Sequence, residues 1–143
     1  MSALAYFLDT NILIYATSFA ADHAVKKPIA REWVARSDWG TSSQVLMEFY
    51  ANAKQPRHGM GADIAREFID TIIAYRQIQA ITPSVVHQAL DLLQRYSLSH
   101  WDAAVLMAAK ALGAPIVISE DMGHGQSYDG ITVINPFLPV HNA

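Results

Sequence analysis

The chain has 143 residues, no cysteine and a formal charge of −3 from 13 acidic and 10 basic side chains. This length suits one domain, so residues 1–143 are expected to form a single domain with a sizeable buried core. With 52% hydrophobic and only 16% charged residues, the composition excludes intrinsic disorder. The absence of cysteine excludes disulfides, thiolate zinc sites and thiol nucleophiles together.

Membrane insertion is not expected either. The longest apolar stretch, residues 103–109, is far shorter than the ~18–20 residues that span a bilayer. No basic signal-peptide region precedes the first apolar run, which indicates a cytoplasmic protein. The negative net charge argues at first sight against a nucleic-acid partner, because phosphate binding usually shows as an excess of basic residues.

The first half of the chain alternates short apolar runs with helical patterns. Residues 4–8 predict a buried strand that ends in the polar triplet Asp9-Thr10-Asn11, where a loop or a helix begins. A helix is predicted over residues 28–36, a second strand over 40–42 and a helix over 44–53. This order is typical of an α/β fold.

The second half continues the alternation after a polar break at residues 55–59. Thr82 and Ser99 are expected to start two helices, and Gly113 is expected to end the second. The predicted elements are a helix over 62–75, a strand over 78–81, helices over 83–96 and 99–112, and strands over 116–119 and 131–134. The whole predicts an α/β domain with a mainly parallel sheet.

Four acidic residues occupy unusual positions in this pattern. Asp9 follows the first strand by one residue, and Asp121 comes two residues after Ser119, at the end of the fourth strand. Glu48 lies within an apolar helical run, and Asp102 lies in the first turn of a helix that is apolar on almost every side. Because ligands of open parallel sheets bind beyond the carboxyl ends of the strands, acids placed there are candidates for a functional site.

Each acid also has a simpler interpretation. Asp9 is equally compatible with a helix N-cap, and Asp102 follows Ser99 at the spacing of a capping box. Glu48 is compatible with a surface position whose charged end reaches water, and Asp121 with an ordinary loop acid. The joint placement of all four favours a shared site over four separate coincidences.

If the four carboxylates converge, they need protons or cations. Two like charges ~4 Å apart repel by about 4 kcal/mol at an effective dielectric constant of about 20. Oxygen ligands favour Mg²⁺ or Mn²⁺ over zinc, and the lack of cysteine agrees with that choice. Such ions reach substrates through phosphate oxygens, which points to metal-assisted hydrolysis of a phosphodiester.

Four segments carry a family resemblance. In order and spacing, the chain resembles PIN-domain nucleases, and it is most similar to bacterial VapC-type toxins of toxin–antitoxin pairs. The segments are Phe7-Leu8-Asp9-Thr10-Asn11, Val45-Leu46-Met47-Glu48-Phe49-Tyr50, His100-Trp101-Asp102-Ala103-Ala104 and Ser119-Glu120-Asp121-Met122-Gly123-His124-Gly125.

The resemblance implies a three-layer α/β/α sandwich in which the first and fourth strands are adjacent. It implies that Asp9, Glu48, Asp102 and Asp121 form a catalytic, metal-binding cluster for Mg²⁺ or Mn²⁺. It also implies an endoribonuclease that forms a homodimer and is blocked by a small antitoxin protein. Asn11 and Ser119 match positions that support the cluster by hydrogen bonding in the family.

Some other residues have weaker signals. Lys54 and Arg57 flank the polar break after the Glu48 helix and are compatible with phosphate contacts or with a solvated loop. The apolar settings of Trp33, Trp39 and Trp101 favour core or dimer packing over stacking on a base.

Two alternative functions use the same acidic crevice. A phosphotransfer domain of the haloacid-dehalogenase type needs a second acid where this chain has Asn11, and a receiver domain needs a lysine near Asn135-Pro136. A non-catalytic binding module is disfavoured by the complete set of four acids. With these four assigned to metal binding, nine acids face ten bases, and the net charge no longer excludes an RNA partner.

Overall fold

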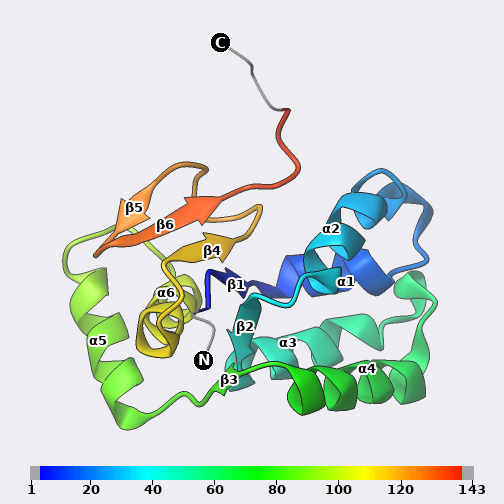
Figure 1. Ribbon diagram of the computed structural model, residues 1–143, viewed down its shortest axis with the longest axis horizontal. Helices are drawn as coiled ribbons and strands as arrows, with labels where there is room; N and C mark the ends of the chain where they lie inside the picture. Colours follow the sequence, from blue (N-terminus) through cyan, green and yellow to red (C-terminus); the bar gives the residue numbers. More distant parts are fainter. Residues whose placement is uncertain (1–3, 140–143) are drawn as a thin grey trace.

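The computed structural model describes residues 4–139. In this part of the chain, six strands form one sheet in the order β3-β2-β1-β4-β6-β5 (Figure 1). Strands β1 to β4 and β6 pair in parallel, and β5 pairs antiparallel with β6 at the edge. The strands are β1 Tyr6–Leu8, β2 Trp39–Ser42, β3 Ile78–Gln79, β4 Ile116–Ile118, β5 Ser127–Tyr128 and β6 Ile131–Ile134.

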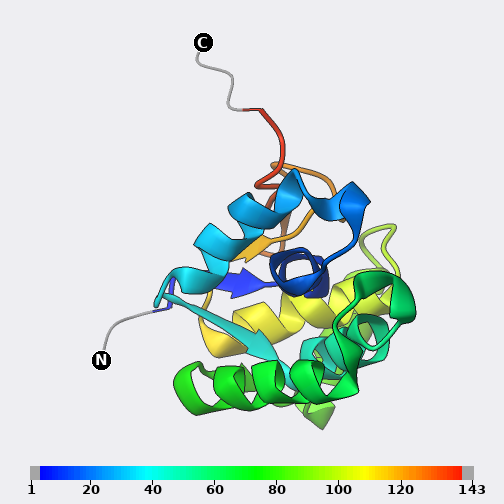
Figure 2. The same ribbon diagram turned by 90° about the vertical axis from the view of Figure 1, so that its right-hand side faces the viewer.

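Helices cover both faces of this sheet. Figure 2 shows α2 and α6 on opposite sides of β1, and α6 packs against four strands. The helices are α1 Thr10–Thr17, α2 Lys26–Ala35, α3 Ser43–Ala53, α4 Gly61–Tyr75, α5 Pro83–Leu93 and α6 His100–Leu112, with short 3₁₀ turns at Ala21–His23 and Pro56–His58. The predicted three-layer α/β/α architecture is confirmed. No helix between residues 4 and 139 has the length and apolar character needed to cross a bilayer.

Local signals placed most elements correctly. Thr82 and Ser99 cap α5 and α6 through their hydroxyl groups, and Gly113 ends α6 in the left-handed conformation. The expected adjacency of the first and fourth strands is also confirmed, because β1 pairs with β4 with Leu8 opposite Ile118. The carboxyl ends of these two strands therefore meet at the same edge of the sheet.

One element was left open between a loop and a helix, and the hairpin at the edge of the sheet was missed. Helix α1 follows β1 directly, although its β-branched residues have modest helix propensity, because four of its eight residues are buried in the core. The hairpin of β5 and β6 turns at Asp129 and Gly130, which both have positive φ. An Asp-Gly pair between strands is a strong hairpin signal, and it was available in the sequence.

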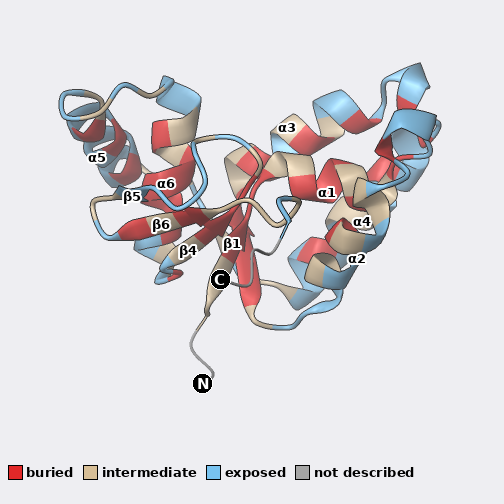
Figure 3. Ribbon diagram, turned by 90° about the horizontal axis from the view of Figure 1, so that it is seen from above, coloured by how far each residue is buried: buried red, intermediate tan, exposed pale blue. Residues whose placement is uncertain are grey.

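The core is formed by the central strands and the inner faces of the helices, as the buried residues in Figure 3 show. Phe7, Leu8 and Val117 are fully buried, as expected for strands covered on both faces. Trp39 is also buried, and its indole N–H donates to the carbonyl of Val34 at 3.1 Å. Trp101, by contrast, is 58% exposed, so it does not pack in the core of this chain, and packing in a dimer, the other expected setting, stays a prediction.

Candidate functional site

Asp9 stands where β1 passes into α1. Its Oδ1 accepts a hydrogen bond from the Thr10 N–H at 2.8 Å, which makes it the N-cap of α1. Its Oδ2 accepts from the Ser119 hydroxyl at 2.8 Å, and the residue is only 5% exposed. The predicted N-cap is therefore present, and it fixes the carboxylate at the carboxyl edge of the sheet.

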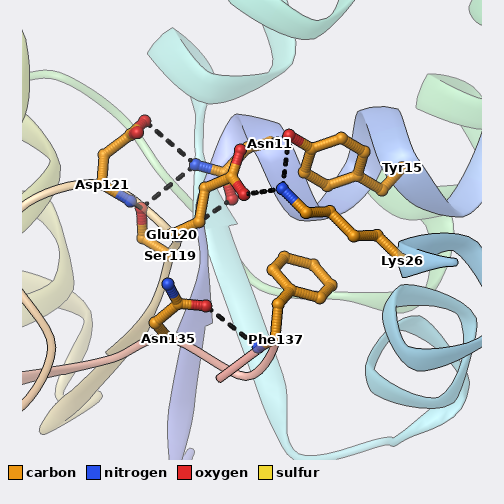
Figure 4. Close-up of polar contacts among 8 residues, drawn as sticks. All are labelled: Asn11, Tyr15, Lys26, Ser119, Glu120, Asp121, Asn135 and Phe137. Carbon is orange, nitrogen blue, oxygen red and sulfur yellow. Dashed lines mark hydrogen bonds and ion pairs between the residues drawn. The ribbon is translucent and has the colours of Figure 1, made fainter. Parts of the chain in front are cut away.

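Asn11 and Ser119 join Asp9 to Asp121 by hydrogen bonds. Figure 4 shows the part of this network that involves Asn11, Ser119 and Asp121. The Asn11 amide donates to the Ser119 Oγ at 3.1 Å and to the Asp121 Oδ2 at 3.2 Å. The Ser119 Oγ also accepts from the Asp121 N–H at 3.1 Å. The buried Ser119 hydroxyl thus binds three groups at once, and the structure places both residues between the two carboxylates.

Glu48 projects from α3 toward the same region. Its Oε2 accepts from the Thr10 hydroxyl at 3.0 Å, and its Oε1 accepts from the Gln44 side-chain amide at 3.1 Å. The same Gln44 amide donates to the Trp101 carbonyl at 3.4 Å, which links α3 to α6. Thr10 and Gln44 were not predicted as site residues. Thr10 lies in the polar triplet Asp9-Thr10-Asn11 and could have been included, whereas nothing in the sequence marks Gln44.

Asp102 lies in the first turn of α6. Its N–H donates to the Ser99 hydroxyl at 3.1 Å, so the predicted N-cap is present. Its side chain lines the same cavity as Asp9, Glu48 and Asp121. The cap therefore sets the backbone of the first turn, while the carboxylate remains available at the cavity wall.

The four acids line one cavity of about 270 Å³. Arg57 also lines this cavity, whereas Lys54 lies outside it, with its Nζ 5.5 Å from the ring centroid of Tyr50. The structure thus brings together every predicted acid and one of the two predicted cations. The other lining residues are Thr10, Asn11, Ile14, Tyr15, His23, Asn52, His58, Trp101 and Val105.

The electrostatics of the cavity reflect its crowding with acids. Burial raises the pKa of Asp9 from 3.8 to about 6, and the charges of Asp121 and Glu48 add to this effect. Hydrogen bonds from Ser119 and Thr10 oppose it. Burial also raises the pKa of Asp102, with further contributions from Asp121 and Glu48. The carboxylates of Asp9 and Asp102 are thus less stable as anions than in water, and a cation relieves this cost.

The donor set suits a hard divalent cation. All four acids offer oxygen ligands, and no thiolate competes, which favours Mg²⁺ or Mn²⁺. As their side chains stand, no three histidine, aspartate or glutamate residues within residues 4–139 lie close enough together to hold an ion. A divalent cation is therefore favoured at this site by the shared cavity and by the raised pKa values of Asp9 and Asp102.

Together, the fold and the cavity define an α/β domain with an acidic site at the carboxyl edge of a mainly parallel sheet. The family model of the PIN domain matches residues 6–126. The chain therefore belongs to the PIN domain family. The match includes all four acids of the cavity and the strands that position them.

Solved structures share this fold at low sequence identity. The toxin VapC20 of Mycobacterium tuberculosis, described as cleaving the sarcin–ricin loop, is 20% identical, with 82% of this chain and 92% of that chain covered and a TM-score of 0.63. A toxin–antitoxin complex from Klebsiella pneumoniae is 22% identical, with 95% and 98% covered and a TM-score of 0.67. VapBC2 of Rickettsia felis, bound to a DNA fragment from its promoter, is 17% identical, with 91% and 97% covered and a TM-score of 0.63. None of the curated proteins matches the chain.

Proposed function

We propose that this protein is a Mg²⁺- or Mn²⁺-dependent endoribonuclease and the toxin of a toxin–antitoxin pair. The observation that carries the proposal is one cavity of a PIN domain that is lined by four carboxylates from four separate segments. The similar structures support the substrate class and the partner: one is a toxin that cleaves an RNA loop, and others are toxin–antitoxin complexes. In this proposal residues 1–143 act as one nuclease domain in the cytoplasm.

Asp9, Glu48, Asp102 and Asp121 would hold the metal. A divalent ion held there would supply Lewis-acid chemistry, which would activate a water and offset negative charge at the attacked phosphate. The chain's own contribution is orientation: the Ser119 hydroxyl fixes one oxygen of Asp9 at 2.8 Å.

Arg57 is the candidate contact for RNA phosphate, because it is the cation that lines the acidic cavity. Lys54, exposed at the end of α3, would extend this contact outside the cavity. With few surplus bases in the chain, we expect the metal site to anchor the scissile phosphate more strongly than a basic surface does. RNA binding should therefore be weak in the presence of a chelator.

A homodimer and an antitoxin complex complete the proposal. Met47, Leu90 and Trp101 are more than half exposed and line a single apolar groove beside the acidic cavity. Monomeric proteins rarely expose large apolar patches, so this groove supports contact with a protein partner. Light scattering on the purified chain should give twice the mass of 15.8 kDa, and Trp101→Glu should lower it; a monomer at all concentrations would contradict the dimer.

The decisive experiment incubates the purified chain with single-stranded RNA and Mn²⁺. Cleavage should disappear with a chelator and in Asp9→Asn, and it should persist in Asp63→Asn, which alters an exposed acid in the first turn of α4 outside the cavity. Cleavage that survives both the chelator and Asp9→Asn would overturn the proposal. Labelling by a phosphodonor would instead favour phosphotransfer, and a failure to bind metal would favour a non-catalytic module.

A further inference from the structure

Two adjacent acids follow β4, and their side chains have different surroundings. Asp121 lines the acidic cavity, whereas Glu120 is absent from its lining. The Glu120 carboxylate instead binds Lys26, whose Nζ lies 2.5 Å from Oε2, and accepts a hydrogen bond from the Tyr15 hydroxyl. Glu120 is thus bound by Tyr15 on α1 and by Lys26 on α2 (Figure 4).

The position of Lys26 is not explained by its own helix. Lys26 is the first residue of α2, and a cation at a helix N-terminus is disfavoured by the helix dipole. Its Nζ lies 4.7 Å from the ring centroid of Tyr15 and 5.4 Å from that of Phe137. These two rings pack edge to face with centroids 5.3 Å apart. The rings of Tyr15 and Phe137 therefore hold the Lys26 ammonium group beside the Glu120 carboxylate.

The turn that carries Asp121 is held on its sheet side by neutral hydrogen bonds: the Ser119 N–H donates to the Ile134 carbonyl at 3.0 Å, and the Tyr128 hydroxyl donates to the Met122 carbonyl at 2.7 Å. Its backbone reaches α1 where the Glu120 N–H donates to the Asn11 Oδ1 at 3.4 Å, a long bond. Immediately after Asp121, Met122 and Gly123 have φ values of 72° and 82°. For a methionine this conformation is costly, and it persists only where surrounding contacts hold the chain. The ion pair between Lys26 and Glu120 is the charged contact of this turn outside the cavity.

We propose that Lys26 is a positioning residue that keeps Asp121 in the acidic cavity by anchoring Glu120 outside it. The anchor has two consequences. It fixes the backbone of residues 119–121, and it keeps the Glu120 carboxylate from turning toward the acids of the cavity. The first consequence concerns the chain alone, while the effect on metal binding rests on the proposed function.

Lys26→Met tests the anchor while keeping an unbranched side chain of similar length. Measured without metal, amide hydrogen exchange of residues 119–123 should become about tenfold faster. The Mn²⁺ dissociation constant from calorimetry should rise about tenfold, as expected when outer partners of metal ligands are lost. Lys26→Arg should restore both values to near those of the unmodified chain.

Lys110→Met is a matched control. Lys110 pairs with Asp129 at 2.6 Å and is 47% exposed, against 2.5 Å and 38% for Lys26 with Glu120. This pair joins α6 to the β5–β6 turn, away from the acidic cavity. The control should leave the exchange of residues 119–123 and the Mn²⁺ dissociation constant unchanged. Urea unfolding of each variant establishes that the measurements refer to folded protein.

A double-mutant cycle shows whether Lys26 acts through Glu120. If it does, Lys26→Met should have little further effect on exchange or metal binding in a Glu120→Gln background. The proposal is overturned if Lys26→Met behaves like Lys110→Met in exchange and in metal binding, or if its effect persists in the Glu120→Gln background. A chain that binds no Mn²⁺ would refute the metal-dependent function, and the exchange measurement would still decide the anchor.

Discussion

The buried carboxyl of Asp9 predicts an unusual pH dependence of stability for the metal-free protein. Its pKa is about 6 in the folded chain, against 3.8 for an ordinary aspartate. This difference corresponds to a cost of about 3 kcal/mol for holding the ionised carboxyl in the folded state. About 2 kcal/mol of this cost develops between pH 4 and pH 8.

The direction of this pH dependence follows from the number of protons that the folded and unfolded states bind. Between about pH 4 and pH 6 the folded state holds a proton on Asp9 that the unfolded state has released, so this group makes the free energy of unfolding fall as the pH rises. Asp9→Asn removes the ionisation. The amide has one acceptor oxygen where the carboxylate has two, so the hydrogen bond from the Ser119 hydroxyl or the one from the Thr10 N–H is lost, which costs about 1–2 kcal/mol at every pH.

The two effects separate when stability is measured at two pH values. In the presence of a chelator, urea unfolding of Asp9→Asn relative to the unmodified chain should improve by about 2 kcal/mol from pH 4 to pH 8. Asp63→Asn, at an exposed position on α4, should show no such change. If Asp9→Asn alters stability by the same amount at both pH values, the carboxyl does not carry the burial cost inferred here.

Three further changes have defined outcomes. Ser119→Ala should destabilise the fold by about 1–3 kcal/mol in urea unfolding, because three groups lose one buried hydroxyl partner. It should also weaken Mn²⁺ binding about tenfold in calorimetry, and an equal Mn²⁺ affinity would contradict this. Arg57→Met should raise the KM for RNA several-fold, Lys54→Met should raise it less, and an unchanged KM for Arg57→Met would remove Arg57 from the RNA contact. Gly40→Ala should lower the free energy of unfolding by about 1–3 kcal/mol or more, since its Cβ would lie 2.7 Å from the Gln77 carbonyl oxygen; unchanged stability would show that β2 and β3 separate easily.

The acidic site was largely predictable because its geometry follows from strand order. Asp9 and Asp121 come just after strands that lie side by side, so their positions in sequence translate directly into positions at one sheet edge. Glu48 and Asp102 were conspicuous as charges in apolar helices, and both line the cavity. Each acid was marked by its immediate sequence neighbours, and the α/β fold class then predicted that the four acids lie in one region.

The contacts that hold these acids were not predictable in the same way. Glu120 meets Lys26 and Tyr15 across 94 and 105 residues of chain. No periodicity or motif marks such a pair, since it depends on how α1, α2 and the β4 edge pack. The apolar neighbours of Trp101 predicted core or dimer packing without deciding between them, and the side chain is 58% exposed and lines both the acidic cavity and the apolar groove.

The central claim is that four carboxylates act together in metal-dependent RNA cleavage, and single-turnover cleavage of an end-labelled RNA in Mn²⁺ tests it most directly. Asp9→Asn, Glu48→Gln, Asp102→Asn and Asp121→Asn should each lower the rate by about 100-fold or more, whereas Asp63→Asn should retain it. An undiminished rate in any of the four, or an equal loss in Asp63→Asn, would contradict the account.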